Sequence, residues 1–430
     1  MILPTYNLVT HFGKPVINFL LKRRCLLGKE NPERIEERRG VPSRSRPNGA
    51  LAWIHAASVG EALSALPLIE RLKKEYPDFR FLITTGTVTS AQVLQQRLPR
   101  DVIHQFIPVD RLAWVEKFLS HWRPNIALWI ESEFWPNLLT RIRKRNIPMI
   151  LINGRISENS RRRWRRLPGT ISNLLGCFTL CLAQSETDAD NLRELGALMV
   201  STTGNIKFAA DPLPANPTFL NDLKRSIGTR PVWLAASTHP GEEKMIIETH
   251  HSLRKALSNL LTIIVPRHPD RGPEISALAS NAKLVTACRS KNQSISDHTA
   301  IYISDTIGEL GTLYRIAPVS FIGGSMVAHG GQNMLEAAKL GSGVIFGPHT
   351  GNFKRVADQM IAEGAAHRVV TTQDLINSLI SLLSDKKSLR AQTEAGLKIS
   401  NSQKKILDDV IQQLRPSMTI AQENQNHAAT

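Results

Sequence analysis

Short apolar runs alternate with helical patterns along most of this chain of 430 residues. In the first half, five runs are typical of buried parallel strands: LAWIHAA (51–57), FLITT (81–85), IALWIE (126–131), MILING (149–154) and FTLCLA (178–183). Between them, apolar residues recur at helical spacing, as in 62–76 and 111–122. This order of strands and helices predicts a doubly wound α/β sheet.

The alternation stops at DPLPANPTF (211–219), a proline-rich segment typical of a linker. It restarts with five further apolar runs, at 232–237, 261–266, 300–305, 319–324 and 343–347. The pattern therefore predicts an α/β protein with two Rossmann-like domains, 48–212 and 213–417, which face a central cleft. An N-terminal segment (1–47) precedes them, and a frayed polar tail (418–430) is expected to follow.

The N-terminal stretch 5–27 places Phe12, Val16, Phe19 and Leu20 at helical spacing before a basic end. Two interpretations remain open, an interfacial helix on a membrane surface and a helix docked on the first domain. Lys14 and Pro15 interrupt the apolar stretch, and the basic cluster follows it instead of preceding it. The pattern therefore predicts neither a membrane-spanning helix nor a signal peptide.

The net charge of the chain indicates which class of partner it binds. The chain has 54 Lys and Arg against 37 Asp and Glu, a formal net charge of +17, which predicts an anionic partner. Many of the cations lie in 141–166, which ends in a run of five arginines around a tryptophan: Arg161, Arg162, Arg163, Trp164, Arg165 and Arg166. The 4 cysteines lack CxxC spacing, so we expect no zinc site and a reducing, cytoplasmic setting.

Two carboxylates follow predicted strands in the first domain. Glu61 lies in IHAASVGE at the start of a helix, and Glu131 lies in LWIESEFWPN at the end of a strand. Each is either an acid that stabilises a helix start or a base that takes a proton from an incoming hydroxyl. Lys207, in GNIKF, closes the first domain.

The second domain carries a candidate nucleotide site. VPRHPDR contains Arg267 and His268, and a loop with two glycine pairs (321–341) precedes a predicted helix. Glycines let a backbone approach a ligand closely, and a helix start offers N–H groups to a phosphate. The alternative is a closely packed turn between a strand and a helix. Because the loop is neither GxGxxG nor a P-loop, NAD and ATP are disfavoured.

Long motifs in a fixed order resemble the Kdo transferases of lipopolysaccharide biosynthesis. They include HAASVGE, WIESEFWPN, LINGRIS, GNIKF, PRHPDR, GELGTLY, FIGGSMVAHGGQNMLEAA and FGPHTGNF, and they run from about His55 to Phe353. The resemblance implies a GT-B fold and inverting, metal-independent transfer of the acidic sugar Kdo from CMP-Kdo to a lipid A precursor, without a cofactor.

The resemblance also assigns roles to residues. It makes Glu61 the general base and gives Glu131 and Lys207 a part in supporting the transition state. It assigns nine residues to CMP binding: Arg267, His268, Ile307, Gly308, Glu309, Asn333, Met334, Leu335 and Glu336.

The membrane is the last partner that the resemblance implies. Family members commonly begin with a longer apolar anchor, so we expect peripheral association with the cytoplasmic face of a bacterial inner membrane. The arginine-rich run 161–166 is expected to contact anionic headgroups there.

Two other functions compete with this one. The nearest is another GT-B enzyme of nucleotide sugars, either an epimerase or an N-acetylglucosamine transferase. The other is a non-catalytic basic module that binds lipid or nucleic acid, which would leave the carboxylates and the glycine-rich loop without a role. The absence of an aromatic stacking platform in the sequence predicts no nucleic-acid partner.

Overall fold

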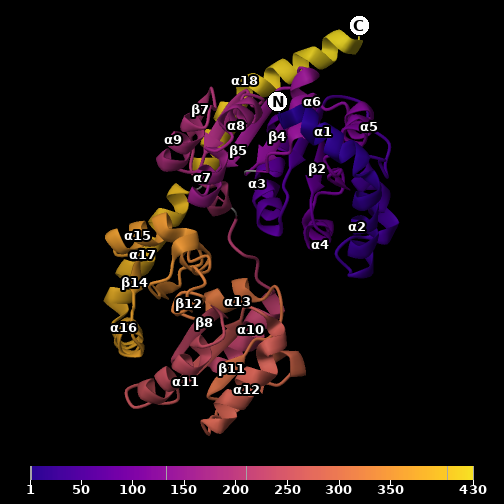
Figure 1. Ribbon diagram of the computed structural model, residues 1–430. Helices are drawn as coiled ribbons and strands as arrows, with labels where there is room; N and C mark the ends of the chain where they lie inside the picture. Colours follow the sequence, from indigo (N-terminus) through magenta and orange to yellow (C-terminus); the bar gives the residue numbers. More distant parts are fainter. Residues whose placement is uncertain (1, 132, 210, 404, 430) are drawn as a thin grey trace. The chain divides into compact units, whose positions relative to one another are not determined.

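The computed structural model describes residues 2–131, 133–209, 211–403 and 405–429 (Figure 1). The chain divides into two compact units, the first of residues 1–210 and 404–430 and the second of residues 211–403. Among the described residues, each unit contains a seven-stranded parallel sheet with helices packed against it. The two doubly wound units confirm the predicted α/β class.

The sheet of the first unit has the strand order β3, β2, β1, β4, β5, β6, β7. Its strands are β1 (Leu51–His55), β2 (Arg80–Thr85), β3 (Ile103–Phe106), β4 (Ile126–Ile130), β5 (Met149–Gly154), β6 (Leu180–Ala183) and β7 (Val200–Thr202). Ala52 and Ile54 join one buried cluster, whereas Leu51 and Trp53 join another. Both faces of the sheet are therefore covered, which is why its central strands are continuous apolar runs.

In residues 32–208, most helices of the first unit follow directly after a strand, except η1, which precedes β1, and α8, which follows α7. They are the 3₁₀ helices η1 (Pro32–Arg39) and η2 (Ile206–Phe208) and the α-helices α3 (Val59–Glu75), α4 (Val88–Arg97), α5 (Leu112–Trp122), α6 (Pro136–Lys144), α7 (Glu158–Trp164), α8 (Pro168–Leu175) and α9 (Glu186–Glu194). Four starts are fixed by hydroxyl side chains that accept a backbone N–H three residues further on. These residues are Ser58, Thr87, Ser157 and Ser185.

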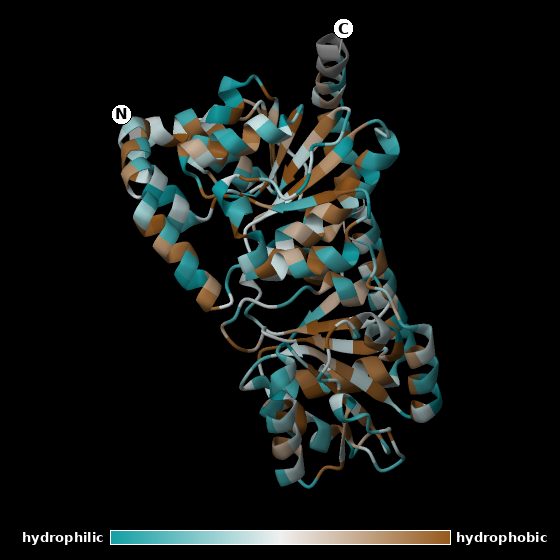
Figure 2. Cartoon of the chain, turned by 90° about the vertical axis from the view of Figure 1, so that its right-hand side faces the viewer, coloured by the Kyte–Doolittle hydropathy of each residue, from teal (hydrophilic) through white to brown (hydrophobic). Residues whose placement is uncertain are grey.

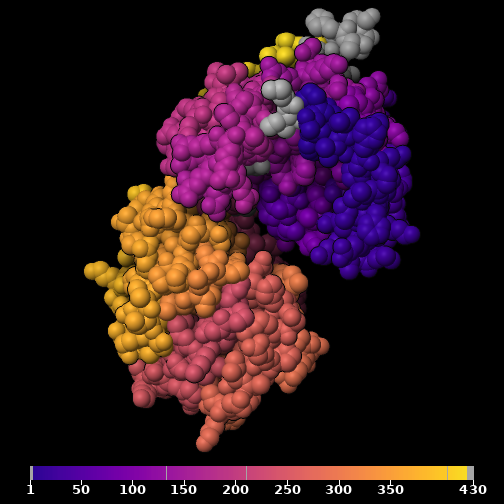
Figure 3. Space-filling model, in the orientation of Figure 1, coloured from indigo at the N-terminus to yellow at the C-terminus, as the bar shows by residue number. Residues whose placement is uncertain are grey.

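Two helices, α1 (Ile2–Phe12) and α2 (Lys14–Leu26), form the N-terminal segment on the surface of the first unit (Figure 3). Helix α1 is docked, because the Tyr6 hydroxyl donates to Asp110 Oδ2 at 3.0 Å. Large apolar side chains nevertheless stay exposed along both helices, and Figure 2 shows hydrophobic stretches there: Leu8, Val9, Phe12, Val16, Phe19, Leu20 and Leu26. The segment is thus docked on the first unit, as one interpretation expects, and exposes an apolar surface, as an interfacial helix would. In the described part of the chain, no helix is both long and apolar enough to cross a bilayer.

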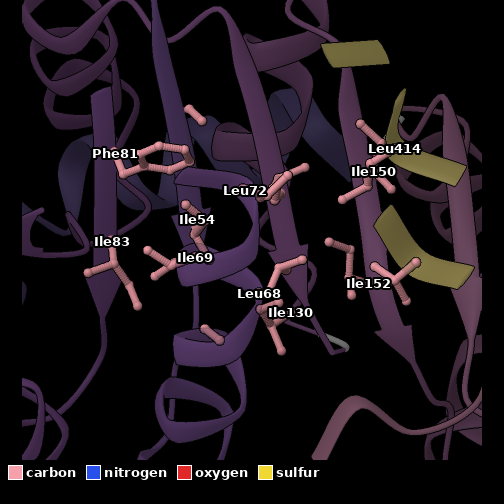
Figure 4. Close-up of a cluster of buried hydrophobic side chains, with 14 of the residues drawn as sticks. Ile54, Leu68, Ile69, Leu72, Phe81, Ile83, Ile130, Ile150, Ile152 and Leu414 are labelled. Carbon is pink, nitrogen blue, oxygen red and sulfur yellow. The ribbon is translucent and has the colours of Figure 1, made fainter. Parts of the chain in front are cut away.

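The C-terminal helix α18 (Lys405–Ala429) belongs to the first unit. Six of its side chains are buried in the core of that unit: Ile406, Val410, Ile411, Leu414, Met418 and Ala421. Figure 4 shows Leu414 beside Ile150 and Ile152 of β5. The predicted end of the second domain at 417 and the polar tail from 418 are therefore wrong. The apolar residues recur at helical spacing and bury one stripe of the helix.

The sheet of the second unit has the strand order β10, β11, β9, β8, β12, β13, β14. Its strands are β8 (Val232–Thr238), β9 (Leu261–Pro266), β10 (Thr286–Cys288), β11 (Ile301–Ile303), β12 (Val319–Ile322), β13 (Gly343–Phe346) and β14 (Ala366–Arg368). Its α-helices are α10 (Pro217–Ile227), α11 (Glu242–Leu253), α12 (Gly272–Asn281), α13 (Leu310–Ile316), α14 (Leu335–Ala338), α15 (Lys354–Ala362), α16 (Thr372–Ser384) and α17 (Lys386–Ser402). The 3₁₀ helices are η3 (Pro269–Arg271), η4 (Arg289–Lys291) and η5 (Gly351–Phe353).

Each sheet has a point, beside the strand that comes first in its sequence, where the chain order reverses. It lies between β1 and β4 in the first unit and between β8 and β12 in the second. In open α/β sheets, ligands bind outside the carboxyl ends of the strands at such a reversal. These two places are therefore where functional side chains are expected.

Candidate active site

Both predicted carboxylates of the first unit lie at its reversal point. Glu61 is in the first turn of α3, which follows β1, and Glu131 comes directly after β4. The two strands are neighbours in the sheet, with Ile54 of β1 opposite Leu128 of β4. Because their carboxyl ends meet at one edge, the fold brings the two acids together.

The Glu61 carboxylate is held by its own turn and is 8% exposed. The Ala57 N–H donates to its Oε2 at 2.7 Å, and the Ser58 hydroxyl donates to its Oε1 at 2.7 Å. Burial raises the pKa of Glu61 above its usual value, while the bonds from Ser58 and Ala57 act in the opposite direction. Glu61 thus stabilises the helix start and also places a buried carboxylate at the reversal point.

Glu131 adopts a strained backbone conformation, with φ of 61°. A left-handed conformation in a non-glycine residue costs on the order of 1–3 kcal/mol and is common at functional sites. Its carboxylate forms an ion pair with Lys207 Nζ and accepts a hydrogen bond from Asn153 Nδ2 at 3.2 Å. The ion pair with Lys207 and the hydrogen bond from Asn153 hold this side chain in place.

Lys207 lies on η2, which approaches the start of α3. A Cβ atom at Gly60 would stand 3.9 Å from both Cε and Nζ of Lys207. Asn153 holds η2 in place, because its Oδ1 accepts the Ile206 N–H at 3.1 Å. The structure therefore gathers Glu61, Glu131 and Lys207 at one sheet edge, where Asn153 is bonded to Glu131 and to the backbone of η2. Asn153 was not predicted as a site residue, although it lies in the motif LINGRIS.

A further pair beside this cluster was not predicted. His55 Nε2 lies 3.6 Å from Glu133 Oε2, and Trp135 Nε1 donates to the same oxygen at 2.8 Å. Burial raises the pKa of Glu133, but its interactions with His55 and Trp135 outweigh this and lower the pKa below its usual value. Glu133 is therefore a second, ionised carboxylate near Glu131.

The loop after β12 in the second unit is fixed by a buried acid. The Glu242 carboxylate accepts four backbone N–H groups at 2.8–3.1 Å, from His239, Gly324, Ser325 and Met326. Nearby, Arg267 and His268 follow β9. The described part of the chain offers the Arg267 guanidinium no ion-pair partner. Arg267 thus remains available to an anionic ligand.

The segment 333–336 lies partly in a loop and partly in a helix of one turn. Helix α14 spans Leu335–Ala338, where a helix was expected, but this single turn offers a phosphate only a small helix dipole. Asn333 Oδ1 accepts the Leu335 N–H at 3.2 Å, and its Nδ2 donates to Glu336 Oε1 at 3.2 Å. Met334 and Leu335 are buried, so the polar groups of this segment belong to Asn333 and Glu336. Burial raises the pKa of Glu336.

The segment 307–309 contributes one exposed and one fixed side chain. Ile307 is 88% exposed and Gly308 has φ of 90°. Glu309 forms an ion pair with Arg289, whose Nε and Nη2 approach Oε1 at 3.0 and 2.8 Å. The Arg289 guanidinium also stacks 4.1 Å above the Phe219 ring. The charge of Glu309 is therefore balanced by Arg289, whereas the Ile307 side chain is exposed to solvent.

The arginine-rich run holds fewer free cations than the sequence suggests. Glu194 pairs with Arg161 and Arg165, and Glu158 pairs with Arg161 and Arg162. Within the described residues, only Arg163 and Arg166 of the run lack an ion-pair partner. Trp164 packs partly buried against the core of the first unit. The cationic surface of 161–166 is thus smaller than predicted.

Comparison with known proteins now identifies the family. A family model described as 3-Deoxy-D-manno-octulosonic-acid transferase (kdotransferase) matches residues 33–210. The 3-deoxy-D-manno-octulosonic acid transferase of Rickettsia bellii is 35% identical over 409 residues, which cover 95% of this chain and 97% of the relative. The chain belongs to the Kdo transferase family. A Kdo transferase of Haemophilus influenzae is 32% identical over 402 residues, 91% of this chain and 93% of its own.

Membership in the Kdo transferase family makes the chain a glycosyltransferase and sets the competing functions aside. The UDP-GlcNAc 2-epimerase of Neisseria meningitidis resembles it in structure, with a TM-score of 0.59 over 85% of this chain and 100% of the epimerase. At 16% sequence identity, this likeness concerns the fold alone. It agrees with the GT-B architecture of two Rossmann-like units.

Proposed function

We propose that this Kdo transferase moves Kdo from CMP-Kdo to a primary hydroxyl of lipid IV(A), with inversion and without a metal ion. The observation that carries the proposal is the buried Glu61 carboxylate beside the Glu131–Lys207 pair, at the reversal point of the first sheet. A base with a raised pKa, next to a fixed cation, suits the removal of a proton from an acceptor hydroxyl.

The reaction balances as a single displacement. The acceptor hydroxyl gives its proton to Glu61 while its oxygen bonds to the anomeric carbon of Kdo. The bond from that carbon to the phosphate oxygen breaks, and its electron pair leaves with CMP. Attack on the face opposite the leaving group inverts the anomeric configuration.

The leaving group explains why cationic side chains replace a metal in this proposal. CMP departs as a phosphate monoester, whose charge guanidinium and ammonium groups stabilise well. Lys207 and Arg267 are the cations that we assign to this task, in place of the helix dipole. Asn333, Glu336 and Ile307 would hold the nucleotide, with His268 and Gly308 beside them. Glu309, Met334 and Leu335 would support these contacts from within the loops.

The direct experiment is Kdo transfer by the full-length protein. CMP-Kdo is formed beforehand, EDTA is then added to one of two samples, and the transferase and lipid IV(A) are added last. The product is measured by mass spectrometry in both samples. We expect a Kdo-bearing product at the same rate in both samples. The absence of product with CMP-Kdo, together with sugar transfer from a UDP-sugar, would contradict the proposed donor.

A lipid acceptor requires contact with a membrane, and we propose peripheral binding at the cytoplasmic face of the inner membrane. The exposed apolar side chains of α1 and α2 support this, with Phe12 73% and Phe19 65% exposed. Lys22 and Arg23 supply positive charge at the end of α2. Next to α1, a cavity of about 390 Å³ is lined by Leu3, Pro136, Leu174 and Arg166 among others. Apolar residues beside cations suit an anionic lipid surface.

Substituting both phenylalanines tests this membrane contact. Phe12→Ser with Phe19→Ser should weaken binding to anionic phospholipid vesicles at least about tenfold, because each buried ring contributes about 1.5–3 kcal/mol. Vesicle flotation measures the bound fraction. Val285→Ser with Val370→Ser, which alters exposed apolar residues of the second unit, is the matched control. Equal binding of both double variants would contradict a role for α1 and α2.

A further inference from the structure

Three histidines from three loops meet at the reversal point of the second sheet. His239 follows β8, His268 follows β9, and His329 lies in the loop after β12. The ring centroids of His239 and His329 are 3.9 Å apart, and those of His239 and His268 are 6.3 Å apart. Because β8 and β12 flank the reversal, the cluster lies where a ligand of this sheet would bind.

Among the described residues, the two acids at the start of α11 beside the cluster both have partners already. Glu242 is occupied by four backbone N–H groups, and Glu243 forms an ion pair with Arg271. Burial lowers the pKa of His239, and the neighbouring His329, His268 and Arg267 lower it further, against a smaller opposite effect of Glu243. Protonating this ring would gather cations without an anion between them, so the free protein favours the neutral form.

The ring of His239 is held in a defined position. Gln332 Nε2 lies 3.1 Å from His239 Nε2. The Gln332 side chain therefore restrains this ring nitrogen. Gly324, with φ of 65°, leaves room for the stack: a Cβ there would stand 3.1 Å from His239 Cδ2 and 3.5 Å from His329 Cδ2. Glycine is therefore required both by the backbone and by the two rings.

A cavity lies beside the loop that carries His329. Ala328 and Gly330, which flank His329, line a cavity of about 420 Å³. The same cavity is lined by His349, Lys354 and Arg368, with Asp358 paired to the last two. His329 itself is exposed, whereas His239 is buried beneath it. A volume of this order accommodates a sugar.

We infer that His239 and His329 form an oxyanion subsite for the sugar-nucleotide donor, a role that rests on the proposed function. The donor carries two oxyanions, the phosphate of the nucleotide and the carboxylate of the acidic sugar. Either oxyanion would supply the negative charge that the histidines lack, because imidazolium rings donate hydrogen bonds to oxygen anions. Arg267 lies near enough to influence His239 and would share the charge.

The test uses two substitutions and one control in the full-length protein. His239→Asn and His329→Asn remove the imidazoles, and His298→Asn alters an exposed histidine elsewhere in the second unit. The KM for CMP-Kdo is measured in the transfer assay, and the Kd for CMP by calorimetry, at about pH 6.5 and about pH 8.

In the wild type, KM should fall as the pH is lowered, because anion binding favours the protonated rings. Each variant should raise KM at least about tenfold at the lower pH and lose this pH dependence. A parallel rise in the Kd for CMP identifies the phosphate as the anion, and an unchanged Kd identifies the carboxylate.

Unchanged KM values and pH dependence in both variants, with an active wild type, would overturn the subsite and leave the proposed function intact. An inactive wild type would instead overturn the proposed function. His329 is exposed, so its substitution does not threaten folding; thermal melting of His239→Asn separates a binding defect from an unfolded domain.

Discussion

Replacing Glu61 by alanine is expected to lower kcat for Kdo transfer by about a hundredfold or more, with the Kd for CMP unchanged. General bases typically contribute 10²–10⁴ to the rate. The side chain lies at the carboxyl end of β1 and is oriented by Ala57 and Ser58. Single-turnover transfer separates this loss from slower product release.

Two control variants isolate the role of the carboxylate. Glu70→Ala removes an exposed acid from the same helix and should leave kcat unchanged. Ser58→Ala removes the capping hydroxyl, keeps the carboxylate, and should cost about 0.5–2 kcal/mol of stability with a small effect on rate. Equal kcat for wild type and Glu61→Ala would remove Glu61 from the mechanism.

The role of Glu61 as a base determines the direction in which kcat/KM changes with pH. A base acts in its ionised form, so kcat/KM should fall as the pH falls through the pKa of Glu61. Because burial raises that pKa, the loss should begin at a higher pH than for an ordinary glutamate. The pH–rate profile of the wild type measures this limb.

Lys207→Ala is expected to lower kcat by about 10²–10³, the usual cost of removing one charge-stabilising donor from an active site. Its ammonium is paired with Glu131 and lies against Gly60, so it is preorganised beside the base. Because Glu131 holds this cation, the double variant Glu131→Gln with Lys207→Ala should lose less than the product of the two single losses.

The exposed Lys117 on α5 provides the matched control, since Lys117→Ala removes a cation from the same unit without touching the cluster. The rates of the wild type, the two single variants and the double variant are taken from initial velocities at saturating donor. Fully multiplicative losses would mean that the two side chains act independently and would contradict a coupled pair.

Much of the fold follows from the apolar pattern. The interior strands of both sheets were predicted within a few residues, because strands buried on both faces are continuous apolar runs. The edge strands β3, β7, β10 and β14 were missed. They are short and pair on one side only, and β3, with the sequence IHQF, mixes polar with apolar residues.

The C-terminal helix was missed for a different reason. Polar residues outnumber apolar ones after Met418, yet Met418 and Ala421 continue the stripe that begins at Ile406. The return of the chain to the first unit is a long-range contact, and local composition carries no information about it.

The candidate site was predicted more from resemblance than from periodicity. Position alone left Glu61 between a cap and a base, and the structure shows how one carboxylate serves the cap while remaining at the reversal point. His55 and Asn153 were not predicted, because a buried polar residue within an apolar strand has no distinctive local pattern. The strain at Glu131 likewise depends on the backbone, which the sequence does not display.

The most direct test of the account is the configuration of the new glycosidic bond. The product of wild-type transfer from CMP-Kdo to lipid IV(A) is isolated, and its anomeric configuration is determined by NMR. Direct displacement with Glu61 as base predicts a configuration opposite to that of the donor. A retained configuration would contradict it, because a single attack from the face opposite the leaving group always inverts the anomeric carbon.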